Sequence, residues 1–423
     1  MANAVKYFTS AMGGAPVVSN NWGDLTAMLD ACLVTGFALR TVTGITRVGT
    51  VATAAINGGN PYQVGQEILI AGAGQAAYNG EKTVTSITAG SVTFDVTGTP
   101  STPATTLTAL SAKVAPLGFE IAFTGANKRA YRSPNVLSKR PYLRVDDSLD
   151  PVWTTTYSKY AKVTMAEGMS DIDAFVGARA PFDPFFPTKN EVGTGAGSAA
   201  INGWHKWIYS QPATGLGLND AGVGGRTWVL VGDDRGFFLS LGRAPGATVR
   251  STYCFNDFES YKASDGFPTL MGATEAYEPA SGGGASQASY NTNFEYTAQY
   301  EGKSLMRDFT QLGVPVRAGF FTLNPSNTQL VSGRVGPVPW PNGPDFSLQL
   351  YPVWVREEAG HVRGLLPGVF FIPQVLPFSD LTVVENVSGY PGRKFLLING
   401  AYGTDSGQAN STRIAFDITG PWR

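Results

Sequence analysis

One stretch near the N-terminus has the spacing of an amphipathic helix. Its apolar residues recur at i, i+3, i+4, i+7 and i+8, namely at Leu25, Met28, Leu29, Cys32 and Leu33. Asn20 or Asn21 is suited to cap the first turn, and Gly36 to end the helix in the left-handed conformation. The pattern predicts one short helix, residues 21–35, within an N-terminal segment of residues 1–40.

After Arg40 the period changes from helical to alternating. Polar and apolar residues alternate, as in half-buried strands, in residues 41–59, 64–72 and 81–96. A Thr-, Pro- and Ala-rich stretch, residues 97–113, then has the composition of a linker. We therefore expect residues 41–113 to form a small β-module, inserted between the N-terminal segment and a main body of residues 114–423.

The main body alternates polar, turn-rich stretches with aromatic strands. Residues 226–243 predict a hairpin whose turn is Gly232–Gly236. Further strands are expected at 315–323, 345–355, 393–400 and 412–418. Because 51 Gly and 27 Pro accompany a charged fraction of only 15%, many short strands joined by turns are favoured over helices. The expected fold is mainly β, with a β-sandwich or barrel-like body that can divide into two subdomains near residues 190–225.

The charge balance restricts the classes of partner. A formal net charge of -1 provides no broad field to gather nucleic acid or an anionic membrane. The chain lacks an apolar run of the ~20 residues that a membrane span needs, and its first residues do not resemble a signal peptide. We therefore expect synthesis in the cytoplasm, and we interpret Cys32 and Cys254 as buried, inert thiols.

Residues 67–77 suggest a dinucleotide site that the following residues argue against. An apolar run precedes a G-x-G-x-x-A turn at Gly72 and Gly74, and Asp95 follows at the distance of a ribose-binding acid. A glycine-rich turn that binds the phosphates of a dinucleotide needs a helix directly after the glycines. Here the turn dipeptide Asn79-Gly80 follows too soon for more than one helical turn. Asp95 is instead expected to point outward from a strand, and no cofactor is expected.

The same stretch resembles a small β-module that recurs in tail proteins of tailed bacteriophages. The residues that carry the resemblance are Pro61-Tyr62, Val64-Gly65-Gln66, Ile68-Leu69-Ile70, Ala73, Tyr78-Asn79-Gly80, Thr83-Val84-Thr85 and Val92-Thr93-Phe94. The first part of the motif differs from the usual pattern of the module, because Asn60-Pro61-Tyr62 replaces the usual His-Gly and Gln66 replaces the usual Asp. The resemblance covers about residues 41–100 and implies a structural protein of the virion, of the tail or baseplate type.

Four further phrases resemble a group of prophage-encoded virion proteins. They are YRS at 131–133, YLRVDD at 142–147, RGLLPG at 363–368 and DITGPW at 417–422. This resemblance implies no enzymatic role.

Several residues could carry chemistry, and each has an ordinary structural alternative. Asp146-Asp147 with Asp150, Asp171 with Asp173, and Asp233-Asp234 could hold Ca²⁺ or act in glycoside cleavage, but Asp is a favoured turn residue, so we expect solvated turns. His205 and His361 are expected to pack against aromatic rings. Gly302-Lys303-Ser304 resembles the end of a P-loop, whose first glycine would fall on Thr297 and is therefore missing.

The aromatic cluster of residues 174–187 could dock a partner or cover a core edge, and we expect the core role. Residues 193–203 and 333–345 read as long loops that contact partners. The function expected from all this is structural: a component of a phage tail, in the distal tail or baseplate, assembled as a symmetric homo-oligomer with other virion tail proteins.

No catalytic residue, metal or cofactor is expected. The alternatives are a receptor-binding or glycan-degrading tailspike that contacts the host surface, and a head decoration or neck protein.

Overall fold

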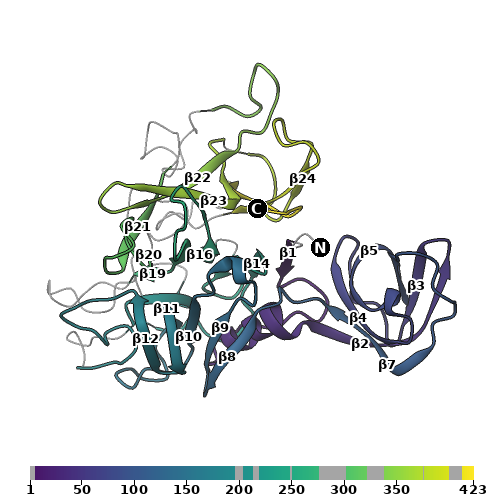
Figure 1. Cartoon of the computed structure of the whole chain (residues 1–423), viewed down its shortest axis with the longest axis horizontal. Helices are drawn as coiled ribbons and strands as arrows, with labels where there is room; N and C mark the ends of the chain where they lie inside the picture. Colours follow the sequence, from purple (N-terminus) through teal and green to yellow (C-terminus); the bar gives the residue numbers. More distant parts are fainter. Residues whose placement is uncertain are drawn as a thin grey trace. The chain divides into compact units, whose positions relative to one another are not determined.

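The computed structural model describes residues 5–195, 203–212, 219–247, 250–275, 302–321, 338–374, 376–399 and 412–423. Within these ranges the fold is mainly β, as the sequence predicts (Figure 1). The chain divides into two compact units, of which one comprises residues 8–16 and 27–118, and the other residues 1–7, 17–26 and 119–423. In the described part of the chain, helices are too short or too polar to cross a bilayer.

The predicted N-terminal helix is present, with a different cap. Helix α1 (Asp24–Leu29) continues as one π-helical segment, η1 (Asp30–Thr35), and ends at Gly36 with φ of 75°. All five apolar residues of the predicted face are fully buried. The expected cap at Asn20 or Asn21 is wrong, because Asp147 accepts the backbone N–H groups of the first turn. The two asparagine side chains bond elsewhere.

The alternating stretches close into a six-stranded antiparallel barrel. Its strands are β2 (Phe37–Val48), β3 (Val51–Ile56), β4 (Glu67–Ala73), β5 (Gly80–Thr88), β6 (Ser91–Asp95) and β7 (Thr106–Val114). The order around the barrel is β2-β3-β6-β5-β4-β7, and Phe37 pairs with Val114 where the chain enters and leaves. Alternate residues fill the interior, and Asp95 is exposed as predicted. Closure removes the unpaired edges that an open sheet would have.

The turn after β4 is a compact corner. Gly72 has φ of 94°, and a Cβ there would meet the carbonyl of Ala109, so only glycine fits. The following 3-10 helix, η2 (Ala76–Tyr78), has three residues, which confirms that no long helix follows the glycines. Asn79 then accepts from the Ala73 N–H at 3.0 Å and donates to the Ala73 carbonyl at 2.7 Å. These bonds use the polar atoms of Asn79 to close the corner.

The second unit contains two antiparallel sheets. The seven-stranded sheet comprises β8 (Glu120–Gly125), β9 (Lys128–Arg132), β10 (Tyr142–Asp146), β11 (Lys159–Asp171), β12 (Ala174–Ala180), β13 (His205–Ser210) and β19 (Thr274–Glu275). Its order is β19-β13-β11-β10-β9-β8, with β12 pairing β11, and a short 3-10 helix, η3 (Val136–Ser138), joins β9 to β10.

The other sheet has thirteen strands among the described residues. They are β1 (Lys6–Thr9), β14 (Trp228–Asp233), β15 (Gly236–Gly242), β16 (Arg250–Asp257), β17 (Glu259–Ser260), β18 (Thr269–Gly272), β20 (Lys303–Leu305), β21 (Val316–Phe321), β22 (Tyr351–Glu357), β23 (Val362–Phe371), β24 (Val383–Glu385), β25 (Lys394–Asn399) and β26 (Thr412–Asp417). The order is β1-β14-β15-β16-β18-β20-β21-β22-β23-β26-β25-β24, with β17 pairing β23. The predicted hairpin with its turn after Asp233 is confirmed.

The thirteen-stranded sheet curls back on itself. The ring of Phe238 on β15 lies 5.1 Å from the ring of Phe416 on β26, although six strands separate them in the sheet order. Residues from both halves of the sheet form one apolar cluster. On the outer side of β25, Phe395 and Leu397 belong to a second cluster. One strand therefore contributes its alternate residues to two cores.

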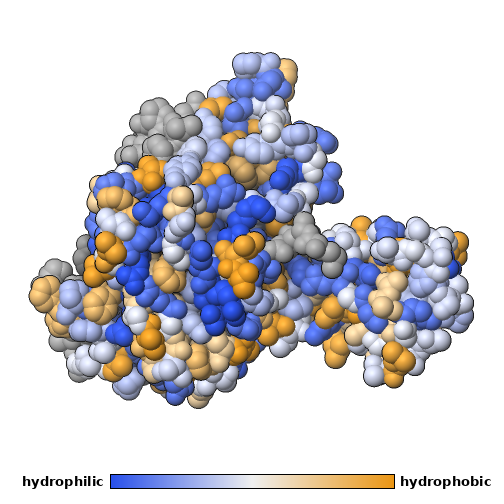
Figure 2. All heavy atoms as spheres, viewed as in Figure 1, coloured by the Kyte–Doolittle hydropathy of each residue, from blue (hydrophilic) through white to orange (hydrophobic). Residues whose placement is uncertain are grey.

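One face of the seven-stranded sheet packs against the larger sheet. Trp207 on β13 lies within 6.0 Å of the ring centres of Phe237 and Tyr253, and its indole N–H donates to the Gly272 carbonyl. The polar face of the seven-stranded sheet carries the candidate site. On the molecular face shown in Figure 2, apolar side chains lie in small groups among polar ones.

Candidate functional site

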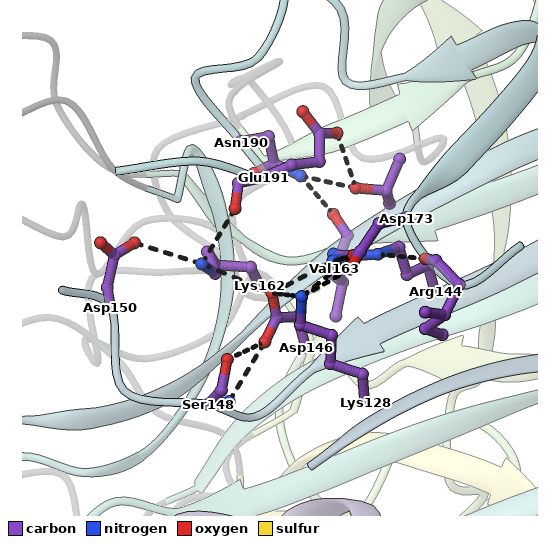
Figure 3. Close-up of polar contacts among 12 residues, drawn as sticks. Lys128, Arg144, Asp146, Ser148, Asp150, Lys162, Val163, Asp173, Asn190 and Glu191 are labelled. Carbon is purple, nitrogen blue, oxygen red and sulfur yellow. Dashed lines mark hydrogen bonds and ion pairs between the residues drawn. The ribbon is translucent and has the colours of Figure 1, made fainter. Parts of the chain in front are cut away.

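A row of charged residues crosses the seven-stranded sheet. Lys128 on β9 pairs with Asp146 on β10, Asp146 pairs with Lys162 on β11, and Lys162 pairs with Lys206 on β13. Directly opposed residues in neighbouring strands have adjacent side chains, so the register alone brings these four charges together. Figure 3 shows most of this row together with the polar residues around it.

Asp146 lies at the centre of the network. Its carboxylate is 3.2 Å from Arg144 Nη2, 3.5 Å from Lys162 Nζ and 3.8 Å from Lys128 Nζ, and it also accepts a hydrogen bond from Ser148. Burial alone would raise the pKa of Asp146, but Lys162 and Arg144 outweigh it and hold the pKa below its usual value. Asp146 is therefore an ionised, buried counter-ion.

Lys162 fixes two connecting segments to the sheet. Its amino group lies 3.2 Å from Asp150 and donates to the Glu191 carbonyl at 3.1 Å (Figure 3). Beside it, Asn190 donates to the Val163 carbonyl and to Thr164 Oγ1, both at 2.8 Å. Because these contacts join residues far apart in the sequence, they stabilise both segments against the sheet.

Arg144 connects the network to the β11–β12 turn. Its Nε donates to the Ile172 carbonyl at 2.8 Å, and its Nη2 contacts both Asp146 and Asp173. The Arg144 side chain is 1% exposed, whereas that of Asp173 is 56% exposed. The exposed carboxylate of Asp173 also pairs with Lys128 at 2.9 Å, so the network extends to the surface at this point.

Asp147 points away from the network and binds the helix. Its carboxylate accepts the N–H groups of Gly23 and Leu25 at 3.0 Å and of Thr26 at 3.3 Å, and the Tyr209 hydroxyl donates to it at 2.7 Å. Burial raises the pKa of Asp147 to about 7, while these hydrogen bonds act in the opposite direction. Asp146 and Asp147, which are consecutive at the end of β10, therefore make their contacts on opposite faces of the sheet.

The prediction of solvated turns is wrong for Asp146, Asp147, Asp150 and Asp233, which are at most 2% exposed. They are buried because basic side chains or backbone N–H groups distant in sequence satisfy them. Asp233 does lie in a turn and accepts the Arg235 and Gly236 N–H groups. Asp171 is exposed, as predicted.

The surroundings of Asp146 suit ion pairing rather than metal binding. Three cationic groups surround Asp146 within 3.8 Å, and a divalent cation would have to displace them. Among the described residues, no group of three His, Cys, Asp or Glu side chains is placed to hold a metal ion. Asp146, Asp150 and Asp173 are each paired with a cation.

Of the four residues in the row, sequence reasoning named only Asp146 and missed Lys128, Lys162 and Lys206. Lys206 has the most unusual surroundings of the three lysines. Among the described residues it has no hydrogen-bond or ion-pair partner, and its amino group lies 4.1 Å from the centre of the Tyr160 ring. Burial lowers the pKa of Lys206 to about 7, with Asp150 opposing and Lys162 adding to this effect. Lysines within largely apolar strands, at Lys159 and Lys162 on β11 and at Lys206 on β13, were the available signal, but the partners of Lys162 lie on other segments.

The remaining candidates have structural roles. The His205 ring lies 5.5 Å from that of Trp204, and the His361 ring lies 4.1 Å from that of Phe309, so both histidines pack against aromatic residues as expected. Burial lowers the pKa of His205 to about 3, which keeps its ring neutral. Lys303 begins a strand rather than the helix that a P-loop requires.

Cys32 and Cys254 are free and buried, as predicted. Burial raises the pKa of Cys254 to about 12, so its thiol is not a nucleophile at neutral pH.

The core role predicted for residues 174–187 is wrong for two of the phenylalanines. Phe185 is 86% exposed and Phe186 is 50% exposed, while Arg179 lies over the rings of Phe175 and Phe182. The Asp183 carboxylate accepts a hydrogen bond from the Phe185 N–H and forms an ion pair with Lys189. These contacts fix a turn in which the rings of Phe185 and Phe186 point outward.

The predicted partner-contacting loops lie partly outside the described residues, which omit 196–202 and 322–337. The Gly/Ser-rich part of the first loop and the start of the second are therefore not placed.

Comparisons with known proteins add little. No family model and no curated protein matches the chain. Among solved structures it is similar to the phage phi92 endosialidase, with 9% sequence identity and a TM-score of 0.16, over 90% of this chain and 52% of that chain. The chain thus spans about half the length of the solved chain that it matches. A TM-score this low carries no argument about fold or function.

Proposed function

We propose that the chain is a structural component of a bacteriophage tail, in the distal tail or baseplate, that assembles as a symmetric homo-oligomer. It is synthesised in the host cytoplasm, ends in the virion and contacts other virion tail proteins. No catalytic site or cofactor belongs to this role.

The barrel of residues 37–114 is the observation that carries the proposal. The residues that resemble the phage-tail β-module occupy its structurally demanding positions: Tyr78 is fully buried, Asn79 closes the corner after β4, and Gly80 has φ of 91°. A buried aromatic residue, a closing amide and a left-handed glycine thus follow one another at one corner, which supports the resemblance.

The phrases that resemble virion proteins also fall on fold-determining residues. Arg144, Asp146 and Asp147 belong to the buried network and the helix cap. The Trp422 indole packs where a Cβ of Gly368 would lie, and its N–H donates to the Asp417 carbonyl at 2.9 Å. These residues are used for stability, which suits a structural role.

Immunogold electron microscopy of the particles that contain this chain tests the proposal. Antibody against the purified chain is expected to label the tail tip at symmetric positions. Label on the head or neck would contradict the tail position, and absence of the chain from purified particles would contradict the structural role altogether.

A separate assay tests the absence of enzymatic activity. Purified chain is expected to leave host surface polysaccharide intact, as measured by the release of reducing ends. Depolymerisation that is lost in Asp173→Asn, the variant of the most exposed network carboxylate, would support a glycan-degrading tailspike instead.

A further inference from the structure

An exposed apolar surface lies beside strands β17, β21 and β23 of the thirteen-stranded sheet. It comprises five large side chains, which we call the tip surface: Tyr261 (64% exposed), Phe309 (43%), Leu312 (89%), Val314 (67%) and Val362 (42%). They come from the segment after β17, the segment before β21 and the start of β23. Exposed apolar residues that converge from separate segments are typical of an interaction site.

The three segments are in direct contact. The Trp354 indole N–H donates to the Tyr261 hydroxyl at 2.7 Å, and the Tyr261 N–H donates to the Arg363 carbonyl at 2.8 Å. The ring of Phe309 stacks near that of His361, the residue before Val362. These contacts bring the segments of Tyr261, Phe309 and Val362 together, and Leu312 and Val314 follow Phe309 in the same segment.

A buried arginine holds this surface rigid. Arg363 donates from Nη1 to Glu357 at 2.7 Å and to the Arg307 carbonyl at 2.8 Å, and from Nη2 to Asp265 at 2.9 Å. Arg363, Glu357 and Asp265 are all at most 5% exposed, so these charge-assisted bonds are shielded from water. A surface ordered before binding loses little conformational entropy on contact.

The charges beside the tip surface are complementary to each other. Lys262 follows β17, which pairs with one side of β23, while Glu358 follows β22, which pairs with the other side. Both are exposed, and neither has an ion-pair partner among the described residues. In a contact between identical subunits, Lys262 of one copy can face Glu358 of the next, as self-complementary interfaces require.

We propose that the tip surface docks a second copy of this chain, with Lys262 and Glu358 pairing across the contact. The inference rests on the homo-oligomer of the proposed function and names the surface that forms it. One exposed lysine beside an apolar surface does not make the basic cluster that recognises an anionic lipid surface. A net charge of -1 leaves little repulsion between copies.

Sedimentation velocity of the purified full chain, over a concentration series, tests the proposal. Leu312→Asp is expected to weaken self-association at least tenfold, whereas Leu107→Asp, which alters a 76% exposed leucine of the barrel, should leave it unchanged. Lys262→Glu and Glu358→Lys should each weaken association, and the double variant should restore it. Circular dichroism establishes that each variant is folded.

The outcomes separate this inference from the proposed function. A wild-type oligomer that is unaffected by Leu312→Asp and by the charge reversals would overturn the tip surface and leave the homo-oligomer standing. A wild-type chain that stays monomeric at every concentration would overturn both. Weakening by Leu312→Asp without rescue in the double charge variant would overturn the Lys262–Glu358 pairing.

Discussion

Removing the buried amine of Lys206, which has no hydrogen-bond partner in the part of the chain that the structure describes, is expected to stabilise the protein. The substitution Lys206→Met keeps most of the side-chain length, so the packing around it is preserved. It removes a buried positive charge that lies directly opposite Lys162 and is stabilised by the Tyr160 ring and, more weakly than burial destabilises it, by Asp150. Most core substitutions destabilise, so a gain would be specific to this charge.

The magnitude follows from the pKa. Folding lowers the pKa of Lys206 from 10.5 to about 7, which corresponds to about 5 kcal/mol of penalty for the charged amine. Loss of the cation–π contact with Tyr160 offsets about 1–2 kcal/mol of this. We expect Lys206→Met to raise the free energy of unfolding by about 3–4 kcal/mol at pH 6, where the penalty is complete.

The pH dependence gives a second signature. Because folding lowers the pKa of Lys206, its amine is charged in both the folded and the unfolded chain below about pH 7. Between about pH 7 and 10.5 it is charged in the unfolded chain but neutral in the folded one. The penalty therefore fades as the pH rises through this window, and the advantage of Lys206→Met should shrink between pH 6 and pH 9.

Tryptophan fluorescence during urea unfolding is a suitable assay. All eight tryptophans lie outside residues 27–118, so the signal reports on the unit that contains Lys206. Lys162→Met should lose about 3–5 kcal/mol, because it leaves Asp146 and Asp150 short of a cation. Lys139→Met, at an exposed position, should change little. A loss of more than about 1 kcal/mol in Lys206→Met at pH 6 would refute the reasoning.

Three further outcomes are expected. Folding raises the pKa of Asp147 from 3.8 to about 7, so the stability of wild type relative to Asp147→Asn should rise as the pH falls from 7 to 4, measured by urea unfolding. Gly368→Ala should lower the thermal midpoint far more than Gly360→Ala, because only the former meets the Trp422 ring, although both have positive φ. Asn79→Ala should cost the isolated barrel about 1–3 kcal/mol in thermal unfolding, through two lost backbone hydrogen bonds; an unchanged midpoint would contradict its closing role.

Local patterns predicted the elements of this fold well. The helical face at residues 25–33 and the hairpin turn at Gly232–Gly236 depend on neighbours in sequence, and both were correct in outline. The first residues of the barrel were missed, since β2 begins at Phe37 and not after Arg40. That start is set by pairing with β7, more than sixty residues later, which periodicity does not record.

The candidate site was harder to predict because its partners are remote. Aspartates are common in turns, so the solvated interpretation of Asp146 and Asp150 followed local statistics. Their burial depends on Lys162, which strand register brings opposite Asp146. The helix cap shows the same limit, since Asp147 lies 122 positions from Leu25.

The barrel's entrance and exit have a consequence for how such a chain can be rearranged. Phe37 and Val114 are paired across neighbouring strands, so their backbones are about 5 Å apart. Excision of the residues between them would leave two ends that a short linker can rejoin, and a different module with adjacent termini could be substituted there. The barrel is in this sense an exchangeable cassette, although a replacement would also have to pack against residues 8–16 and 27–36, which belong to the same compact unit.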